Sequence, residues 1–430
     1  MAPKEIPPAQ DPALAPRELA NMVDPRHALV TLAGKMDWQA ASVQFGPLYV
    51  PGRGRPAISI RLMVGLHYLK HAFNLSDEQV VMHWAENPYW QYFCGEQYFQ
   101  YRLPIDPSQM SRFRKRIGPS GCEFLLKLTI NAGLITKTIV PASLEAVNVD
   151  TTVQEKAIAF PTDGRLYHKA RVTLVREAKK AGLRLRQSYE RLGKQALVMN
   201  ARYAHARQMK RARREQKRLR TYLGRVMRDI ERKIQSAPVL ADRFRDCLSI
   251  GHRIHAQQRH DKNKIYSVHA PEVECIAKGK AHKHYEFGVK VSVVTPSPDN
   301  FVVGMQALPS NPYDGHTLEA AIGQTVNLTG ITPKQAFVDR GYKGHRPQRL
   351  SVWIAGAKRG VTNLIKKRLK RRNAIEPVIG HMKVDGPLGR NFLKGAIGDA
   401  MNATLCAAGH NLRKILHQLS HSFSPTDAPA

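Results

Sequence analysis

Residues 144–150 read Leu-Glu-Ala-Val-Asn-Val-Asp, a short run of strand-forming residues that ends on the carboxylate of Asp150. Branched side chains in such a run favour a strand. A second run of this type, residues 154–160, is predicted to pair with the first. We therefore expect a sheet with an acid at the end of its first strand.

Downstream residues extend this sheet and add helices. Runs rich in valine, phenylalanine and tyrosine predict strands at 264–268, 285–294, 301–308 and 335–338. Apolar residues at helical spacing predict helices at 317–328 and 391–419. The last of these strands runs directly into Asp339, which places a second carboxylate at a strand end. This order of elements predicts a mixed α/β (α+β) fold.

A third acid, Glu376, lies on a helical segment late in the chain. Acids at neighbouring strand ends, closed by a helical acid, would form one acidic cluster in a basic protein. Carboxylate oxygens suit Mg²⁺, which keeps several waters and takes further ligands from its substrate. Two ions about 3.5–4 Å apart can activate an attacking oxygen and stabilise a leaving one. We expect Asp150, Asp339 and Glu376 to hold two divalent ions, Mg²⁺ or Mn²⁺ in its place, for phosphoryl transfer.

Cations flank these acids. Arg372, Glu376 and Lys383 fall within about 40° on one helical face, provided that Pro377 does not kink the helix. Arg340 directly follows the second acid. We predict that these three cations, Arg372, Lys383 and Arg340, contact DNA phosphate.

The region 36–140 is predicted to be an all-helical domain for DNA binding or dimerisation. Apolar spacing predicts a helix at 61–73, and Ser76 with Gln79 forms a capping-box start for the next helix. Ser108 is expected to cap a later helix whose cations either contact phosphate or form a solvated face: Arg112, Arg114 and Lys115. Within residues 51–56, Arg53 and Arg55 either enter a DNA minor groove or belong to a basic loop ahead of a helix.

A strongly basic segment, residues 165–262, is predicted to interrupt a catalytic domain that spans 141–420. Its part from 165 to 235 holds 23 Lys and Arg residues against 5 acids. Apolar residues recur there at helical spacing, which predicts one or two long amphipathic helices in a hairpin or coiled coil. The basic outer face either grips DNA or is solvated.

The amino-acid composition indicates which kinds of partner the protein binds. The 430 residues carry a formal net charge of +33, which favours a polyanionic partner and above all nucleic acid. No apolar run of membrane-spanning length or signal-peptide pattern is visible, so no membrane is expected. The five cysteines are scattered singles, which fits a reducing cytoplasm. Residues 1–35 and 421–430 read as flexible tails.

Three segments together resemble the DDE transposases of bacterial insertion sequences, most closely the insertion-sequence-five family. They are residues 149–154 (Val-Asp-Thr-Thr-Val-Gln), 337–342 (Phe-Val-Asp-Arg-Gly-Tyr) and 372–383 (Arg-Asn-Ala-Ile-Glu-Pro-Val-Ile-Gly-His-Met-Lys). The resemblance implies a ribonuclease-H-like catalytic fold that cuts and joins DNA at element ends with Mg²⁺. It also implies that Asp150, Asp339 and Glu376 are the metal-binding acids and that Arg372 and Lys383 are the basic residues of the third motif.

One position departs from the wider superfamily, which has a tyrosine three residues before that arginine. Leu369 stands there in this chain, so the role of that tyrosine is either absent or supplied elsewhere, for example by Tyr342. Asp314 and His316 either line the cleft or form a turn and a helix cap.

These observations predict a transposase that assembles as a dimer or higher oligomer on the terminal inverted repeats of double-stranded DNA. In the predicted reaction, water cuts the element end and the freed 3′-hydroxyl attacks target DNA. Two alternatives stay open: a ribonuclease-H-like nuclease that does not join, and a non-catalytic DNA-binding protein derived from a transposase.

Overall fold

A computed structural model describes residues 17–50, 57–235, 238–277, 284–344, 350–357 and 360–421. The chain divides into two compact units. Unit 1 consists of Met1–Glu155 and Val289–Ala430, and unit 2 of Lys156–Gly288. No helix among the described residues has the length and apolar character needed to span a membrane.

The sheet of unit 1 has the strand order β3-β1-β5-β6, with β4 paired to β3. Its strands are β1 (Ala146–Glu155), β3 (Tyr285–Pro296), β4 (Gly304–Leu308), β5 (Gln335–Val338) and β6 (Ser351–Ile354). β3 and β4 are antiparallel, whereas β5 is parallel to both of its neighbours, β1 and β6. The prediction that residues 154–160 form a separate partner strand is wrong, because β1 continues to Glu155.

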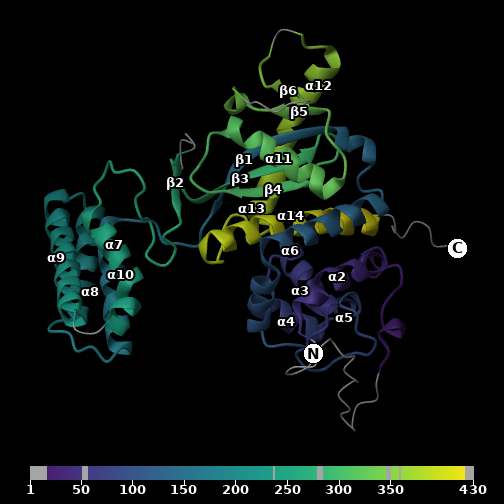
Figure 1. Ribbon diagram of the computed structural model, residues 1–430. Coiled ribbons are helices and arrows are strands. Elements are labelled where there is room, and N and C mark those ends of the chain that lie inside the picture. The colour runs from purple at the N-terminus through teal and green to yellow at the C-terminus, as the bar shows by residue number, and fades with distance from the viewer. Residues whose placement is uncertain are drawn as a thin grey trace. The chain divides into compact units, whose positions relative to one another are not determined.

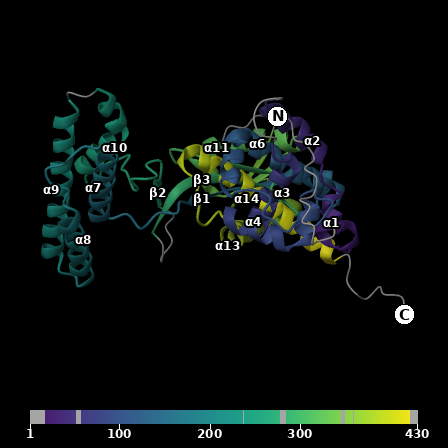
Figure 2. The ribbon, with the colours of Figure 1, turned by 90° about the horizontal axis from the view of Figure 1, so that it is seen from below.

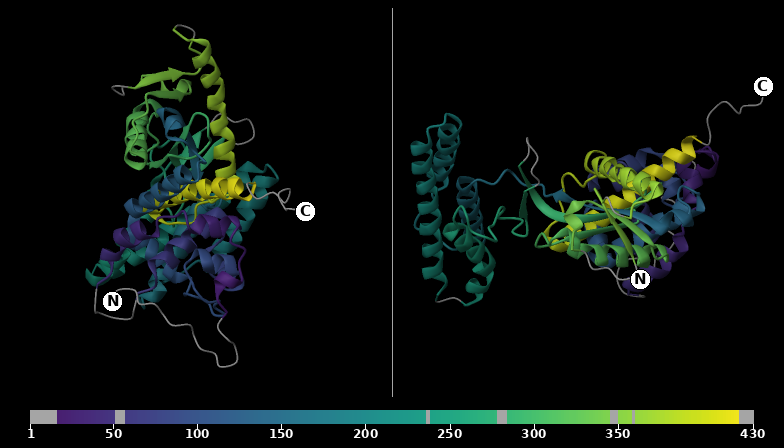
Figure 3. Two further views of the ribbon diagram at one scale, coloured as in Figure 1. Left: turned by 90° about the vertical axis from the view of Figure 1, so that its right-hand side faces the viewer. Right: turned by 90° about the horizontal axis from the view of Figure 1, so that it is seen from above.

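Helices cover both faces of this sheet. Figure 3 (left) shows α11 (Asp314–Thr329) on one face and α12 (Asn363–Arg371) with α13 (Ile375–Val384) on the other. Below the sheet in Figure 1, α6 (Ser108–Ile135) and α14 (Gly395–His421) pack against each other. α6 is kinked at Gly118, whose φ of +63° breaks the helix just before Pro119.

Five further helices precede α6: α1 (Ala28–Ala33), α2 (Trp38–Phe45), α3 (Ile60–Ala72), α4 (Asp77–Glu86) and α5 (Pro88–Phe93). The predicted capping box is confirmed, since Ser76 and Gln79 each bond the other's backbone at the start of α4. Ser108 does not cap α6. Instead it is the first helical residue, and its N–H donates to the carboxylate of Asp106.

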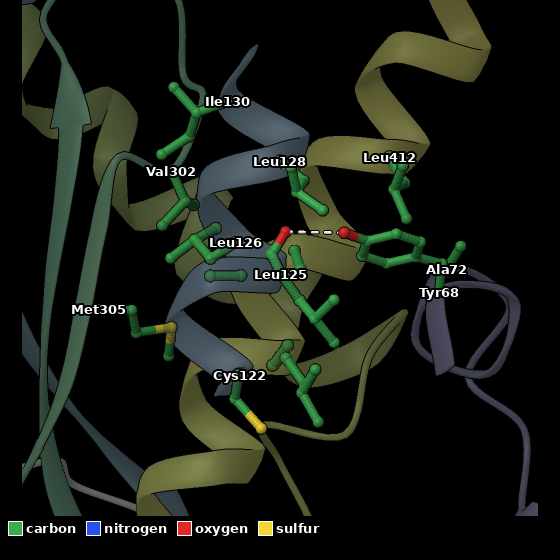
Figure 4. Close-up of a cluster of buried hydrophobic side chains, with 14 of the residues drawn as sticks. Tyr68, Ala72, Cys122, Leu125, Leu126, Leu128, Ile130, Val302, Met305 and Leu412 are labelled. Atoms are coloured by element: carbon green, nitrogen blue, oxygen red, sulfur yellow. Dashed lines mark hydrogen bonds between the residues drawn. The ribbon is translucent and has the colours of Figure 1, made fainter. Parts of the chain in front are cut away.

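The N-terminal helices share one hydrophobic core with the sheet, so the predicted 36–140 domain has no separate core of its own. Figure 4 shows the centre of this core, where the Tyr68 hydroxyl on α3 donates to the Leu125 carbonyl on α6 at 2.9 Å. Val302 and Met305, from the sheet side, pack around the same part of α6. Short 3₁₀ turns complete the unit: η1 (Leu19–Asn21), η2 (Gly46–Leu48), η3 (Pro141–Glu145), η4 (Arg340–Tyr342) and η5 (Arg372–Ala374).

Unit 2 is a helical bundle with its own core (Figure 2). Its helices are α7 (Asp163–Lys180), α8 (Glu190–His205), α9 (Met209–Ile234) and α10 (Pro238–Ala256), and β2 (Glu274–Ala277) pairs antiparallel with Tyr285–Gly288. The prediction of one or two long helices is wrong, because Gly182 and Arg207, both at positive φ, separate α7, α8 and α9. Residues 264–268, predicted as a strand, are not one.

Candidate active site

Asp150 and Asp339 occupy equivalent positions on neighbouring parallel strands. β1 and β5 pair in parallel with Asn148 opposite Phe337. Two residues further along both segments, the same register sets Asp150 beside Asp339. Neighbouring strands lie about 4.8 Å apart, and residues in equal register point to the same face. Each carboxylate is also fixed from its own backbone: Asp150 Oδ1 accepts from the Thr151 N–H at 2.7 Å, and Asp339 Oδ1 accepts from the Gly341 N–H at 2.8 Å.

Arg372 links the first acid to the third. It lies in η5, only 7% exposed, and its Nη1 is 3.2 Å from Asp150 Oδ2. Its Nη2 is 3.9 Å from Glu376 Oε1, and the Glu376 side chain is 67% exposed. Pro377 does not kink the helix, because it lies in the first turn of α13, where its missing N–H costs no hydrogen bond. Arg372 and Glu376 therefore lie together beside the strand ends.

A fourth acid, Asp314, belongs to the same group. As the first residue of α11 it accepts from the Thr151 hydroxyl at 3.2 Å. A Cβ at Gly341 would lie 3.0 Å from both Asp314 Oδ2 and Asp339 Oδ1, so these two carboxylates flank the glycine. His316 is exposed on the first turn of α11, with its ring against that of Tyr313. Of the two open candidates, only Asp314 joins the acids.

Lys290 was not predicted. It lies on β3, 8% exposed, and its Nζ is 3.0 Å from Asp314 Oδ1 and 2.8 Å from the Pro312 carbonyl. A signal was present in the sequence, since Lys290 is the one cation in the strand Tyr285–Pro296. A lysine in such a strand is buried only with a partner of opposite charge.

Tyr342 lies beneath the acids and is fully buried. Burial raises the pKa of its hydroxyl, and the charges of Asp150, Asp314 and Asp339 raise it further. The hydroxyl therefore stays protonated near three carboxylates. It is not an exposed substitute for the superfamily tyrosine, and Leu369 packs at a different place, against Phe337 and Ile365.

Among the residues that the structure describes, no three His, Cys, Asp or Glu side chains are close enough together to hold a metal ion. The site instead combines carboxylates from β1, β5, α11 and α13 with two buried cations, Arg372 and Lys290. It is an acidic group whose charge is partly compensated from within the chain.

The remaining predicted DNA-binding residues have different surroundings. Arg114 is 4% exposed and its Nη1 and Nη2 donate to both carboxylate oxygens of Asp77, so a phosphate contact is contradicted for this residue. Arg112 and Lys115 on the same helix are exposed. The exposed Arg340 lies against Gly356, where its guanidinium would be 2.9 Å from an added Cβ. Arg53 and Arg55 lie outside the described residues.

Lys383 lines a cavity of about 680 Å³. The other walls come from the start of α4 and from the segment that joins α13 to α14, including Lys70, Arg390 and Phe392. Phe392 is 71% exposed, with the Arg390 guanidinium 5.3 Å from the centre of its ring. The cavity that Lys383 lines thus combines cationic and aromatic groups with the carboxylates of Asp77 and Glu78.

Comparisons with known proteins relate the chain to a family. Residues 17–116 match a family model described as a transposase domain (DUF772). An uncharacterized protein, ORF8 in the nfe locus of Rhizobium meliloti, is 61% identical over 190 residues, which cover 44% of this chain and 91% of that protein. No solved structure matches the chain. The chain therefore belongs to a transposase-related family, together with that Rhizobium meliloti protein.

Proposed function

We propose that this protein is a DDE transposase of the insertion-sequence-five type, which binds the terminal inverted repeats of its element and catalyses metal-dependent cleavage and strand transfer. The observation that carries the proposal is the register of β1 and β5, which sets Asp150 beside Asp339 while Arg372 ties Glu376 to the same place. A sheet with an antiparallel pair on one side of β1 and parallel strands on the other supports a ribonuclease-H-like fold.

The acids fit a divalent cation in their donor chemistry. Asp150 and Asp339 offer carboxylate oxygens from a rigid sheet, and the largely exposed Glu376, held by Arg372 only at 3.9 Å, can turn toward a cation. Mg²⁺ or Mn²⁺, when bound, would supply Lewis-acid stabilisation of the attacking and leaving oxygens. The proposal assigns Asp150, Asp339 and Glu376 to hold it.

The chain's own residues account for the electrostatics around these acids. Arg372 and Lys290 offset the repulsion among closely placed carboxylates, so the group is stable before DNA arrives. Arg340, exposed beside Asp339, and Lys383, at the cavity, are proposed to bind the phosphates on either side of the cut. We further propose a dimer or higher assembly on double-stranded DNA at the bacterial nucleoid.

The test uses purified wild type, Asp339→Asn, Glu376→Gln and Glu319→Gln. Glu319 is an exposed acid on α11 and provides a matched control for the loss of one carboxylate. Each protein is incubated with Mg²⁺, labelled DNA that carries the element's terminal repeats, and a target plasmid. We expect wild type and Glu319→Gln to give cleaved and joined products, and the other two variants to lose about 10³-fold or more of both while still binding.

Nicked products without joined ones would favour the nuclease alternative. Binding by all four proteins without any product would favour the non-catalytic DNA-binding alternative. Undiminished product from Glu376→Gln would remove Glu376 from the proposed site.

A further inference from the structure

The helix α9 divides lengthwise into an apolar half and a cationic half. At about 100° per residue, its buried apolar side chains occupy one side, and they form the centre of the unit 2 core: Leu219, Tyr222, Leu223, Val226, Met227, Ile230 and Ile234. Ten exposed cations occupy about 180° of the opposite side: Lys210, Arg211, Arg213, Arg214, Lys217, Arg218, Arg220, Arg225, Arg228 and Arg232. These ten residues are called the α9 cationic face.

The acids of α9 leave most of this charge uncompensated. Glu215 and Asp229 are buried. Glu215 pairs with Arg218 at 2.9 Å, and Asp229 pairs with Lys233 at 3.1 Å and with Arg232 at 3.6 Å. Glu231 lies 2.5 Å from His252. Within the parts of the chain that the structure describes, Arg213, Arg214, Lys217 and Arg228 pair with no carboxylate. A solvated surface helix ordinarily mixes both signs, so this segregation points to an anionic partner.

The face is hollowed at two places. The first hollow, of about 270 Å³, is lined by Arg213, Lys217 and Arg220 with Tyr167 and Gln216, and Gln216 donates to the Asp163 carboxylate. The second, of about 200 Å³, is lined by Arg225, Arg228 and Arg232 together with Arg186, Gln187, Tyr189 and the paired Asp229. The centres of the two arginine groups are roughly 17 Å apart along the helix.

From these features we propose that the α9 cationic face is a docking surface for the phosphate backbone of double-stranded DNA, separate from the acidic site of unit 1. The face extends roughly 33 Å, and duplex DNA presents about one phosphate charge per 1.7 Å of its axis. Eight of its ten cations are arginines, whose planar fork binds phosphate through two hydrogen bonds. Phosphate contacts carry no sequence information, so this face adds affinity rather than specificity.

A membrane surface is the competing partner for a basic amphipathic helix. Such a helix inserts its apolar side among the lipids. The apolar side of α9 is already buried against α7, α8 and α10, which leaves only cations outside. The structure therefore favours a partner that needs charge alone.

The inference rests on the proposed function for its choice of DNA, but its test measures binding without cleavage. The full chain is compared with two triple variants of the face, Arg213→Gln/Lys217→Gln/Arg220→Gln and Arg225→Gln/Arg228→Gln/Arg232→Gln. The matched control, Arg176→Gln/Lys179→Gln/Lys180→Gln on α7, removes three exposed cations that each face a glutamate at 3.3–3.6 Å. Circular dichroism establishes that every variant is folded.

Fluorescence anisotropy then measures the affinity for a random-sequence duplex between 50 and 300 mM KCl. Each face variant is expected to raise Kd at least about tenfold at 100 mM KCl and to reduce the slope of log K against log salt by about 2.7, since each phosphate contact contributes about 0.9. The control variant is expected to change the slope by less than about 1, and the ratio of terminal-repeat to random-sequence affinity is expected to stay constant in all variants.

Equal losses in face and control variants would overturn the proposal, because net charge alone would then explain binding. Unchanged duplex binding in the face variants would overturn it as well, and so would loss of binding to phosphatidylserine vesicles with duplex binding retained. Failure of the catalytic proposal has a different signature, since wild type would then give no joined product while the slopes described here still shift.

Discussion

Arg114 and Arg372 in unit 1 are 4% and 7% exposed and each faces a carboxylate, whereas Arg213 and Arg228 on α9 in unit 2 are exposed and uncompensated within the described part of the chain. The net charge of +33 counts these residues equally. Their surroundings give them different roles. A buried arginine stabilises the fold only through its anionic partner, whereas an exposed arginine is available to bind an anionic ligand. Four measurements test this contrast.

The largest effect is expected from Asp77→Ala. Asp77 accepts from Arg114 at 2.8 Å and from Lys70 at 2.6 Å, and these hydrogen bonds and charges hold the pKa of Asp77 well below its usual range although burial raises it. Its loss leaves two cations without an anion, so unit 1 should lose about 3–5 kcal/mol of stability. All four tryptophans lie in unit 1, so tryptophan fluorescence during urea unfolding follows this unit alone.

The control for this change is Glu78→Ala, the next residue in the same first turn of α4, whose exposed side chain makes a similar contribution to the helix dipole. It should cost less than about 1 kcal/mol. Equal effects of the two substitutions would show that the Arg114 pair contributes nothing beyond helix capping.

A smaller loss is expected from Arg372→Met. Removal of the guanidinium leaves Asp150 without its 3.2 Å partner, at a cost of about 2–3 kcal/mol for a charged hydrogen bond. Added Mg²⁺ should raise the urea midpoint of Arg372→Met more than that of wild type, since a cation then replaces the missing charge. The exposed neighbour Arg371 serves as the control, and no difference between Arg371→Met and Arg372→Met in Mg²⁺ response would contradict the proposed metal site.

Lowering the pH should destabilise unit 1 about as much as Arg372→Met does, but gradually as the pH falls. Burial, with the Arg114 charge, lowers the pKa of His67 to about 3, and burial lowers the pKa of His410 to about 3. Both imidazoles are neutral in the folded protein, whereas in the unfolded chain they take up a proton with a pKa of about 6.5. The free energy of unfolding is therefore at its full value above pH 6.5. Below pH 6.5 it falls by about 1.4 kcal/mol per pH unit for each of the two histidines. Urea midpoints from pH 7.5 to 5.0 test this, and His410→Gln should flatten the dependence. An unchanged midpoint at pH 5 would contradict the buried neutral histidines.

The smallest effect is expected from Arg213→Gln/Arg228→Gln. These exposed side chains contribute no ion pair to the described structure, so thermal unfolding followed by circular dichroism should change by less than about 0.5 kcal/mol. A loss as large as that from Asp77→Ala would place these arginines among the structural ones and remove the contrast.

The sequence predicted those features that depend on neighbouring residues. The capping box at Ser76, the strand 335–338 and the helix that carries Glu376 are all local patterns, and the structure has each of them. The break between α8 and α9 was missed because Arg207 adopts positive φ without a glycine or proline to announce it, whereas the break between α7 and α8 did have a signal, in Gly182.

Contacts between distant segments were harder to predict. Asp314 and Lys290 lie 24 positions apart, and Arg114 and Asp77 lie 37 apart, so no spacing rule joins either pair. Arg114 was therefore assigned to DNA by charge alone, although its helical face points into the core. The strand register that sets Asp150 beside Asp339 was inferred only in outline, since the pairing of β1 with β5 spans the whole of unit 2.

The place at which unit 2 enters the chain has a consequence for how the protein is made. It begins at Lys156, directly after β1 ends, and finishes at Gly288 within β3, and these two strands are neighbours in the sheet. Closing a flexible loop of that length would cost roughly 4 kcal/mol of chain entropy. A nascent chain completes unit 2 before the rest of β3 leaves the ribosome, and domains that finish early in synthesis fold first. We expect the folded bundle to shorten the effective loop between β1 and β3. During translation, unit 2 would then help the sheet that follows it to form.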